Sequence, residues 1–295
     1  MMPSISVVIP VYNRPDLLRR ALHSLTQQTY KNFEVVICDD GSTVDLKSEV
    51  LNFIDLLKIK YIRIANFGGP ARPRNVAIEN SSGEWISFLD SDDWWLPSRM
   101  ERVVKELDGE ADLIYHQLEL AGKEYPANKS KVYIGAKIGK DCLLDLLTLG
   151  NPIPNSSSIV RRTYLNEIGG ISEDKSLIED FDLWLRMAKN GAMFKFLDQS
   201  LGFYWLGDDN ISVASQRQID LLDNTFEKHI IELPSNYICM AEAFQNYSRG
   251  IIEQRLGYLK QALNSFVKAR KLRTIELKIK RYIKILMLLP QIYLR

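Results

Sequence analysis

Residues 5–42 read ISVVIPVYNRPDLLRRALHSLTQQTYKNFEVVICDDGS, and this stretch decides the fold class. The apolar runs 5–9 and 33–38 are typical of strands buried in a parallel sheet. Between them, Pro15 stands where a first helical turn tolerates proline. Leucines and alanines then recur at helical spacing over 17–25. This order predicts the first strand–helix–strand unit of a doubly wound sheet.

The same alternation continues to residue 115. Further strands are expected at 60–64, 85–89 and 112–115, with helices over 71–80 and from Pro97. We therefore predict an α/β fold with a Rossmann-like, mostly parallel sheet and helices on both faces.

The rest of the chain predicts a second half that is richer in helix. The expected elements are a polar hairpin excursion over 116–134, a helix over 141–149, a strand over 157–160, a helix over 179–190, strand-like runs over 193–197 and 201–206, and only helices beyond 215. We expect a catalytic domain at 1–214, with a nucleotide-binding half at 1–115 and an acceptor half at 116–214. A helical appendage is expected at 215–295.

Composition narrows the function classes. The net charge of +1 argues against a nucleic-acid binder that relies on overall charge. Three widely separated cysteines suit a reducing cytosol. No apolar stretch is long enough to span a membrane, and the first ten residues do not resemble a signal peptide. We expect a cytoplasmic protein.

Polar residues follow the strands at the rim where an open parallel sheet binds ligands. They lie at 10–13, 39–42 and 90–93. A single acidic motif of this kind could also be a helix cap or a turn. There is no glycine-rich phosphate loop after the first strand. An acidic rim would repel a diphosphate unless a divalent cation lay between them, and Asp-x-Asp offers the oxygen ligands that Mg²⁺ or Mn²⁺ prefers.

The ordered set of motifs resembles the family 2 glycosyltransferases with the GT-A fold. It comprises Pro10 to Asn13, Asp39 to Ser42, Asn66 to Asn75 and Leu89 to Asp93. The resemblance covers about residues 4–212. It implies an inverting transferase that moves a sugar from a nucleotide donor, with UDP-sugars the first candidates, to a glycan or a lipid-linked glycan.

The resemblance assigns donor roles to particular positions. They are Pro10, Tyr12, Asn13, Asp40, Arg74, Asn75 and Asp90 for the nucleotide sugar, and Asp92 for the metal. Tyr12 would pack on the uracil and Pro10 would shape the turn. Asp40 would accept a hydrogen bond from uracil N3–H, which cytosine lacks. Arg74 and Asn75 would support the diphosphate.

Asp90 would lie near the ribose, and Asp92 would bind Mn²⁺ or Mg²⁺. Asp93 could cap the next helix or support the metal site from behind. Trp94 and Trp95 could floor the acceptor site or be buried behind the motif. Many relatives place a histidine metal ligand where this chain has Gly207. The neighbouring Asp208 or Asp209, or water, could complete the metal shell instead.

A Glu-Asp segment at 178–186 follows Gly169-Gly170 and resembles the acceptor motif of the family. An acceptor hydroxyl needs a base that takes its proton during attack. Asp180 matches the position of that base, and Glu179 could hold the acceptor or the donor sugar. Asp180 could instead only cap the helix. The remaining side chains at Asp182, Trp184 and Arg186 are expected to pack or pair on the helix.

The C-terminal segment is basic and amphipathic. Residues 255–295 carry eleven Lys or Arg and one acidic residue, and 275–289 mixes lysines with isoleucines and leucines. This suits an interfacial helix on the inner face of an anionic membrane, where lipid-linked acceptors lie. A solvated helix packed on the rest of the protein is the alternative.

Two other functions are alternatives to a glycosyltransferase. A sugar-1-phosphate nucleotidyltransferase would carry a glycine-rich loop with a basic residue after the first strand, which Pro10 to Arg14 does not provide. A non-catalytic glycan-binding or scaffold module would be expected to lose Asp92 or Asp180, and both are present.

Overall fold

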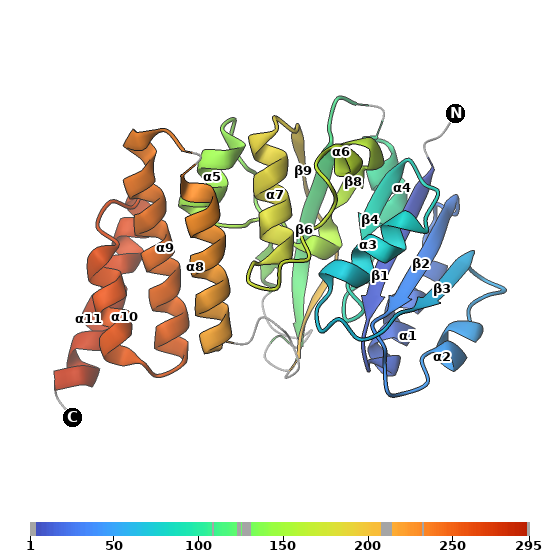
Figure 1. The fold of residues 1–295 in the computed structure, drawn as a ribbon, viewed down its shortest axis with the longest axis horizontal. Coiled ribbons are helices and arrows are strands. Elements are labelled where there is room, and N and C mark those ends of the chain that lie inside the picture. Colours follow the sequence, from blue (N-terminus) through green and yellow to red (C-terminus); the bar gives the residue numbers. More distant parts are fainter. Residues whose placement is uncertain are drawn as a thin grey trace. The chain divides into compact units, whose positions relative to one another are not determined.

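The computed structural model describes residues 4–107, 109–122, 125, 131–207, 214–231 and 233–293. The chain divides into two compact units, which are described separately. The sheet unit comprises Met1–Lys137, Pro152–Glu173 and Asn190–Gly207, and the helical unit comprises Ile138–Asn151, Asp174–Lys189 and Asp208–Arg295. Figure 1 shows the strands of the first unit and the helices of the second.

Within the described residues, the sheet unit forms a nine-stranded sheet with the order β3-β2-β1-β4-β8-β6-β9-β5, and β7 pairs with β6. The strands are β1 (Ile5–Val11), β2 (Phe33–Asp39), β3 (Ile59–Arg63), β4 (Trp85–Phe88), β5 (Trp94–Trp95), β6 (Leu113–Gly122), β7 (Tyr133–Ile134), β8 (Ile159–Arg161) and β9 (Phe194–Leu206). Strands β3, β2, β1 and β4 are parallel. Strand β8 is antiparallel to β4 and β6, so the other half of the sheet is mixed.

Helices cover both faces of the parallel half. The sheet unit contains α1 (Pro15–Thr26), α2 (Lys47–Leu51), α3 (Ala71–Glu79), α4 (Arg99–Val104), the 3-10 helix η1 (Asn155–Ser157) and α6 (Arg162–Glu167). Leu18 of α1 and Met100 of α4 join one apolar cluster with Val7 and Ile9 of β1. Helix α3 also contacts β1 and β2, but none of its residues belongs to this cluster. Successive strand residues point to opposite faces, so α3 covers the other face. The predicted α/β fold is confirmed.

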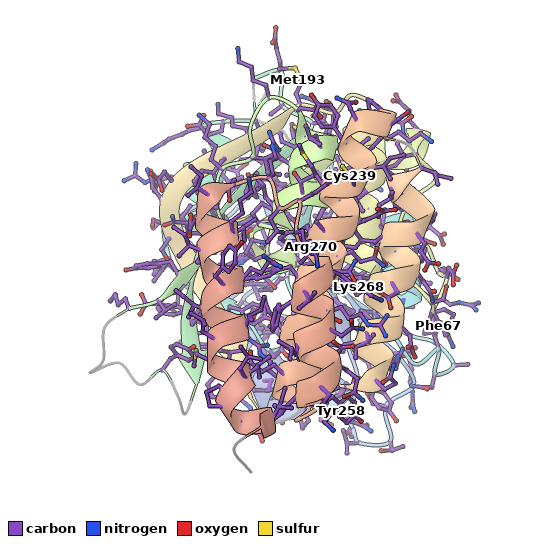
Figure 2. The ribbon with its side chains drawn as sticks, turned by 90° about the vertical axis from the view of Figure 1, so that its left-hand side faces the viewer. Phe67, Met193, Cys239, Tyr258, Lys268 and Arg270 are labelled. Atoms are coloured by element: carbon purple, nitrogen blue, oxygen red, sulfur yellow. The ribbon has the colours of Figure 1, made fainter. Side chains whose placement is uncertain are left out.

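The helical unit contains α5 (Cys142–Leu149), α7 (Glu179–Lys189), α8 (Gln216–Ile230), α9 (Ser235–Arg255), α10 (Leu259–Lys268) and α11 (Ile275–Tyr293). Tyr258 and Lys268 lie at the two ends of α10 (Figure 2). Helix α10 packs closely on α9. A Cβ added at Gly250 of α9 would lie only 2.9 Å from the Phe266 ring of α10. Among the described helices, none is both long and apolar enough to cross a membrane.

The structure differs from the sequence predictions in the second half of the sheet. The fifth predicted strand does not end at residue 115 but runs as β6 to Gly122. The two strand-like runs near residue 200 form one strand, β9. Helices α5 and α7 belong to the helical unit. The functional boundary expected at residue 214 stays a prediction.

Candidate active site

Three loops that carry predicted site residues leave neighbouring strands at the same edge. Strand β1 lies between β2 and β4, and all three are parallel. Tyr12 therefore follows β1 beside Asp40 after β2 and Asp90 after β4. Pro10 lies inside β1 and not after it. Its missing N–H is tolerated because pairing of β1 with β4 ends at Val8.

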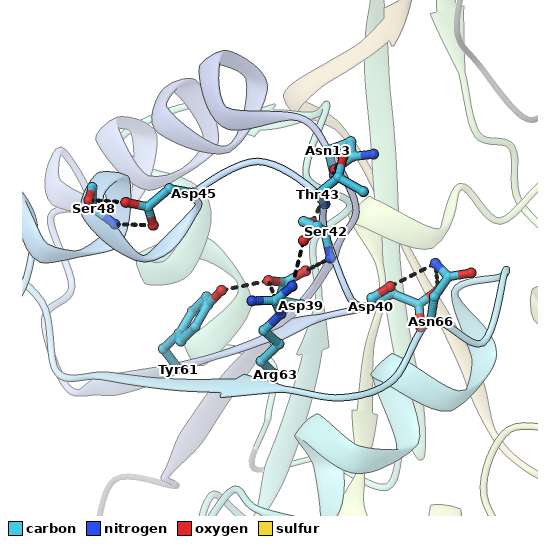
Figure 3. Close-up of polar contacts among 10 residues, drawn as sticks. All are labelled: Asn13, Asp39, Asp40, Ser42, Thr43, Asp45, Ser48, Tyr61, Arg63 and Asn66. Atoms are coloured by element: carbon cyan, nitrogen blue, oxygen red, sulfur yellow. Dashed lines mark hydrogen bonds and ion pairs between the residues drawn. The ribbon is translucent and has the colours of Figure 1, made fainter.

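Asp39 fixes the loop that follows β2 (Figure 3). Its carboxylate is 1% exposed and accepts hydrogen bonds from the Tyr61 hydroxyl at 2.6 Å and the Ser42 amide at 2.8 Å. The Ser42 hydroxyl accepts from the Asn13 amide at 2.9 Å, and Asn13 Oδ1 accepts from the Thr43 amide at 2.7 Å. Asn13 thus joins the loops after β1 and β2. Its predicted contact with the donor stays a prediction.

Asp40 is held in one orientation by the backbone that follows β3. Its Oδ1 accepts from the Phe67 amide at 2.7 Å, and its Oδ2 accepts from the Gly68 amide at 2.9 Å. Oδ2 also accepts a longer hydrogen bond from Asn66 Nδ2 at 3.4 Å, whereas Oδ1 has a further lone pair for another donor. The Tyr12 side chain is 45% exposed, so its ring is available for stacking. Both arrangements are compatible with binding of a nucleobase.

Asp90 and Asp92, which we call the acidic cluster, have different arginine partners. Asp90 Oδ1 lies 2.6 Å from Arg74 Nη2 and 3.0 Å from Asn155 Nδ2. The Arg74 side chain is 4% exposed. Its positive charge, which is expected to support a diphosphate, is paired with Asp90 in this structure. Asn155 was not predicted, because its Pro- and Ser-rich loop carries no pattern beyond that of a turn.

Asp92 Oδ2 lies 2.7 Å from Arg14 Nη1, and its side chain is 14% exposed. Burial and the charge of Asp90 raise the pKa of Asp92, while Arg14 opposes the rise. Each carboxylate of the cluster is thus paired with one arginine, and burial still disfavours the charged form of Asp92.

Asp93 does not cap the next helix, which corrects one of its two expected roles. Its carboxylate is buried, and its Oδ1 accepts a hydrogen bond from the Trp205 amide of β9 at 2.8 Å. The residue at the N-cap position of α4 is Ser98. Burial, together with the charges of Asp92 and Asp90, raises the pKa of Asp93 well above its ordinary value.

The two tryptophans differ in what they could offer an acceptor. Trp95 is 2% exposed, and its Nε1 donates to the Ser156 carbonyl at 2.7 Å. A side chain this buried presents no ring face to a sugar, so the expected acceptor contact of Trp95 is replaced by packing. Trp94 stacks on Phe203 at 4.9 Å, and the Arg20 guanidinium lies 4.0 Å from its ring centre. Acceptor binding by Trp94 stays a prediction.

Asn75 binds the turn formed by Gly169 and Gly170. Its Nδ2 donates to the Ile171 carbonyl at 2.8 Å, and its Oδ1 accepts from the Ile171 amide at 3.0 Å. Gly170 has a φ of +72°, and a Cβ there would lie 3.2 Å from Asn75 Oδ1. Asn75 therefore has a structural role besides the predicted support of the diphosphate.

The acidic cluster offers two of the hard oxygen donors that a divalent cation takes. Asp92, whose side chain is 14% exposed, would supply one of them to a bound cation. In the part of the chain that the structure describes, no group of three or more His, Cys, Asp or Glu residues forms a complete metal site. The two expected substitutes for the missing histidine, Asp208 and Asp209, lie outside the described residues.

Glu179 and Asp180 form the first turn of α7 in the helical unit. Asp180 Oδ1 accepts a hydrogen bond from the Phe181 amide at 2.7 Å, and the side chain is partly exposed. Asp180 is the second residue of the helix, so it does not occupy the N-cap position itself. A carboxylate in the first turn is favoured by the helix dipole whether or not it has another role.

Asp182 anchors α7 within the helical unit. Its carboxylate is 0% exposed and lies 2.7 Å from Arg186 Nε, 2.7 Å from Lys228 Nζ and 2.9 Å from His229 Nε2. Burial raises the pKa of Asp182, but these three partners outweigh it and hold the pKa below the ordinary value. Trp184 is buried. The prediction that Asp182, Trp184 and Arg186 pack or pair is confirmed.

The chain matches the family model described as glycosyl transferase family 2 over residues 6–168. A protein of Escherichia coli described as UDP-Glc:alpha-D-GlcNAc-diphosphoundecaprenol beta-1,3-glucosyltransferase WfgD is 30% identical over 242 residues, which are 78% of this chain and 89% of that protein. Some other curated relatives are much longer, and the chain covers 32% of the length of one from Rickettsia felis.

Solved structures show the same fold. TarS 1-349 of S. aureus in complex with UDP-GlcNAc has a TM-score of 0.64 at 22% identity, covering 92% of this chain and 82% of that one. The mannosyltransferase PcManGT from Pyrobaculum calidifontis, in complex with GDP-Man and Mn²⁺, has a TM-score of 0.65 at 18% identity, covering 98% and 81%.

Proposed function

The chain belongs to glycosyl transferase family 2, and we propose that it transfers a sugar, with inversion, from a UDP-sugar to a hydroxyl of a lipid-linked glycan. The observation that carries the proposal is the edge of the sheet where Tyr12, Asp40 and the acidic cluster follow adjacent parallel strands. The UDP-sugar and the diphosphoundecaprenol acceptor in the name of WfgD support this donor and acceptor class. Family membership argues against the nucleotidyltransferase alternative.

In the proposed mechanism, Tyr12 stacks on the uracil and Asp40 accepts its N3–H. Asp180 takes the proton of the acceptor hydroxyl as its oxygen attacks the anomeric carbon, and the bond to the nucleoside diphosphate breaks in the same displacement. A divalent cation held by Asp92 would neutralise the negative charge of the diphosphate. The Mn²⁺ bound together with GDP-Man in the PcManGT complex supports this choice of cofactor.

Metal dependence of donor binding tests the proposal. We expect calorimetry to show UDP binding with Mn²⁺ and much weaker binding with EDTA, because the carboxylates of the acidic cluster need a cation between them and the diphosphate. Asp92→Asn should lose the Mn²⁺-dependent part, typically more than about tenfold in affinity for a charge-assisted ligand contact. Asp55→Asn, at an exposed aspartate of the same unit, is the matched control. Equal UDP affinity with and without Mn²⁺ would remove the metal from the proposal.

Helix α11 supports a peripheral position on the inner face of the cytoplasmic membrane. Its inner side packs in the helical unit through Leu288 and Arg281, whose guanidinium donates to carbonyls of α10. The opposite side exposes an apolar stripe with side chains between 51% and 75% exposed: Ile275, Ile279, Tyr282, Ile283 and Leu286. Exposed lysines at 278 and 280 flank it. An apolar stripe flanked by lysines suits an anionic interface.

We expect the full chain to sediment with anionic vesicles at low salt and to remain unbound with neutral ones. Replacing Ile279 and Leu286 together by glutamate should abolish sedimentation, because the stripe then carries negative charge, while UDP affinity stays unchanged. Ile231→Glu is the control, since Ile231 is 76% exposed but lies outside α11. Vesicle binding that survives the double substitution would assign the contact to another surface.

A further inference from the structure

The two arginines that neutralise the acidic cluster, Arg14 and Arg74, differ in how deeply their side chains are buried. Arg74 is 4% exposed and its partner Asp90 is 25% exposed, whereas Arg14 is 22% exposed and its partner Asp92 is 14% exposed. When a buried guanidinium such as that of Arg74 leaves its carboxylate, its charge stays uncompensated in the protein interior. When a partly exposed guanidinium such as that of Arg14 leaves, water or another anion can take the place of its partner at smaller cost, whereas the mostly buried Asp92 carboxylate then needs another cation. Of these two ion pairs, Arg14–Asp92 is the one that can exchange partners.

Arg14 also lies in the loop that carries the exposed ring of Tyr12. The backbone of this loop is fixed on both sides, by the hydrogen bonds of Asn13 to the loop after β2 and by Pro15 at the start of α1. The guanidinium reaches Asp92 at the end of a long side chain with several rotatable bonds. It can therefore change its partner without movement of the backbone.

We propose that Arg14 is a built-in counter-cation of Asp92 that exchanges partners when the donor binds. In the donor-free protein, the guanidinium neutralises the Asp92 carboxylate. In the donor complex, Asp92 becomes available to a divalent cation and Arg14 binds a phosphate oxygen of the nucleoside diphosphate. The planar guanidinium fork suits phosphate as well as carboxylate. This inference rests on the proposed function, because it requires a diphosphate donor beside Asp92.

Replacing Arg14 by glutamine should therefore change two affinities in opposite directions. Affinity for Mn²⁺ alone should rise about fivefold, the scale of one partly exposed ion pair that no longer competes for Asp92. Affinity for UDP in the presence of Mn²⁺ should fall by about tenfold or more, because one charge-assisted bond to phosphate is lost. Electron paramagnetic resonance of free Mn²⁺ measures the first quantity, and calorimetry measures the second.

Two further variants make the result specific. Arg19→Gln also removes one arginine charge, but at a residue of α1 that pairs with Asp16 and Glu49, so both affinities should stay within about twofold. Arg14→Lys keeps the charge beside Asp92 but lacks the planar fork. The lysine variant should leave Mn²⁺ affinity near the wild-type value and weaken UDP binding. It also serves as the test variant if Arg14→Gln fails to fold.

A glutamine variant that weakens both affinities would make Arg14 a simple ligand-binding or loop-shaping residue and overturn the exchange. Two unchanged affinities would overturn it as well. Failure of the proposed function looks different, because the wild-type protein itself would then not bind UDP with Mn²⁺. That result would overturn both the proposed function and the exchange.

Discussion

Replacing Asp180 by asparagine is expected to lower kcat for sugar transfer by about 10²–10⁴-fold, the usual loss when a general base is removed. Asparagine has nearly the shape of aspartate, and its carbonyl oxygen can still accept the hydrogen bond that the Phe181 amide donates to Asp180 Oδ1. It cannot take the proton of an acceptor hydroxyl. Donor affinity and melting temperature should therefore stay close to the wild-type values.

The same substitution distinguishes a base from a residue that only stabilises the helix. Asn and Asp support a helix start about equally well, so a purely structural Asp180 would leave kcat almost unchanged. Glu179→Gln is the matched control, since it removes a neighbouring carboxylate from the same helical turn. Full activity of Asp180→Asn together with a large loss in Glu179→Gln would transfer the role of base to Glu179.

The parallel half of the fold was predictable because its signals are local. Strands buried on both faces appear as continuous apolar runs, which is how β1, β2 and β4 were located. The two-residue strand β5 was not predicted, because Trp94 and Trp95 form it only by pairing with Phe203 and Gly202 more than 100 residues later. Such pairing depends on tertiary structure and leaves no local periodicity.

For the candidate site, the sequence likewise predicted local features but not long-range contacts. The order of motifs located the carboxylates at the strand ends, since Asp40 follows β2 directly and Asp90 follows β4 after one residue. It did not locate their partners, because the Arg14–Asp92 ion pair joins residues 78 positions apart. Burial also could not be derived from the motif, so the difference between a buried Trp95 and a partly exposed Trp94 required the structure.

Replacing Asp182 by alanine is expected to give the largest loss of stability. The carboxylate is fully buried, and its removal leaves His229, which is 3% exposed, without this partner in the helical unit. Removing one member of a buried charged network costs about 3–5 kcal/mol. We expect about 3 kcal/mol, at the low end of this range, because Lys228 is 43% exposed and can be solvated. Urea unfolding at pH 7 measures the free energy of unfolding.

Acidification should reduce this difference, and the sign follows from the lowered pKa of Asp182 in the folded protein. A carboxyl whose folded pKa lies below its unfolded value of about 3.9 stabilises the protein fully above that value, and the stabilisation is lost as the pH falls toward the folded pKa. The free energies of wild type and variant should therefore converge below about pH 4. Glu276→Ala is the control, because this exposed carboxylate of the same unit pairs with Lys280 one turn away on α11 and its removal should leave the free energy of unfolding close to the wild-type value. If Asp182→Ala unfolds at the wild-type urea concentration at pH 7, the three contacts of Asp182 do not stabilise α7, and the position of Asp180 depends on other residues of the helix.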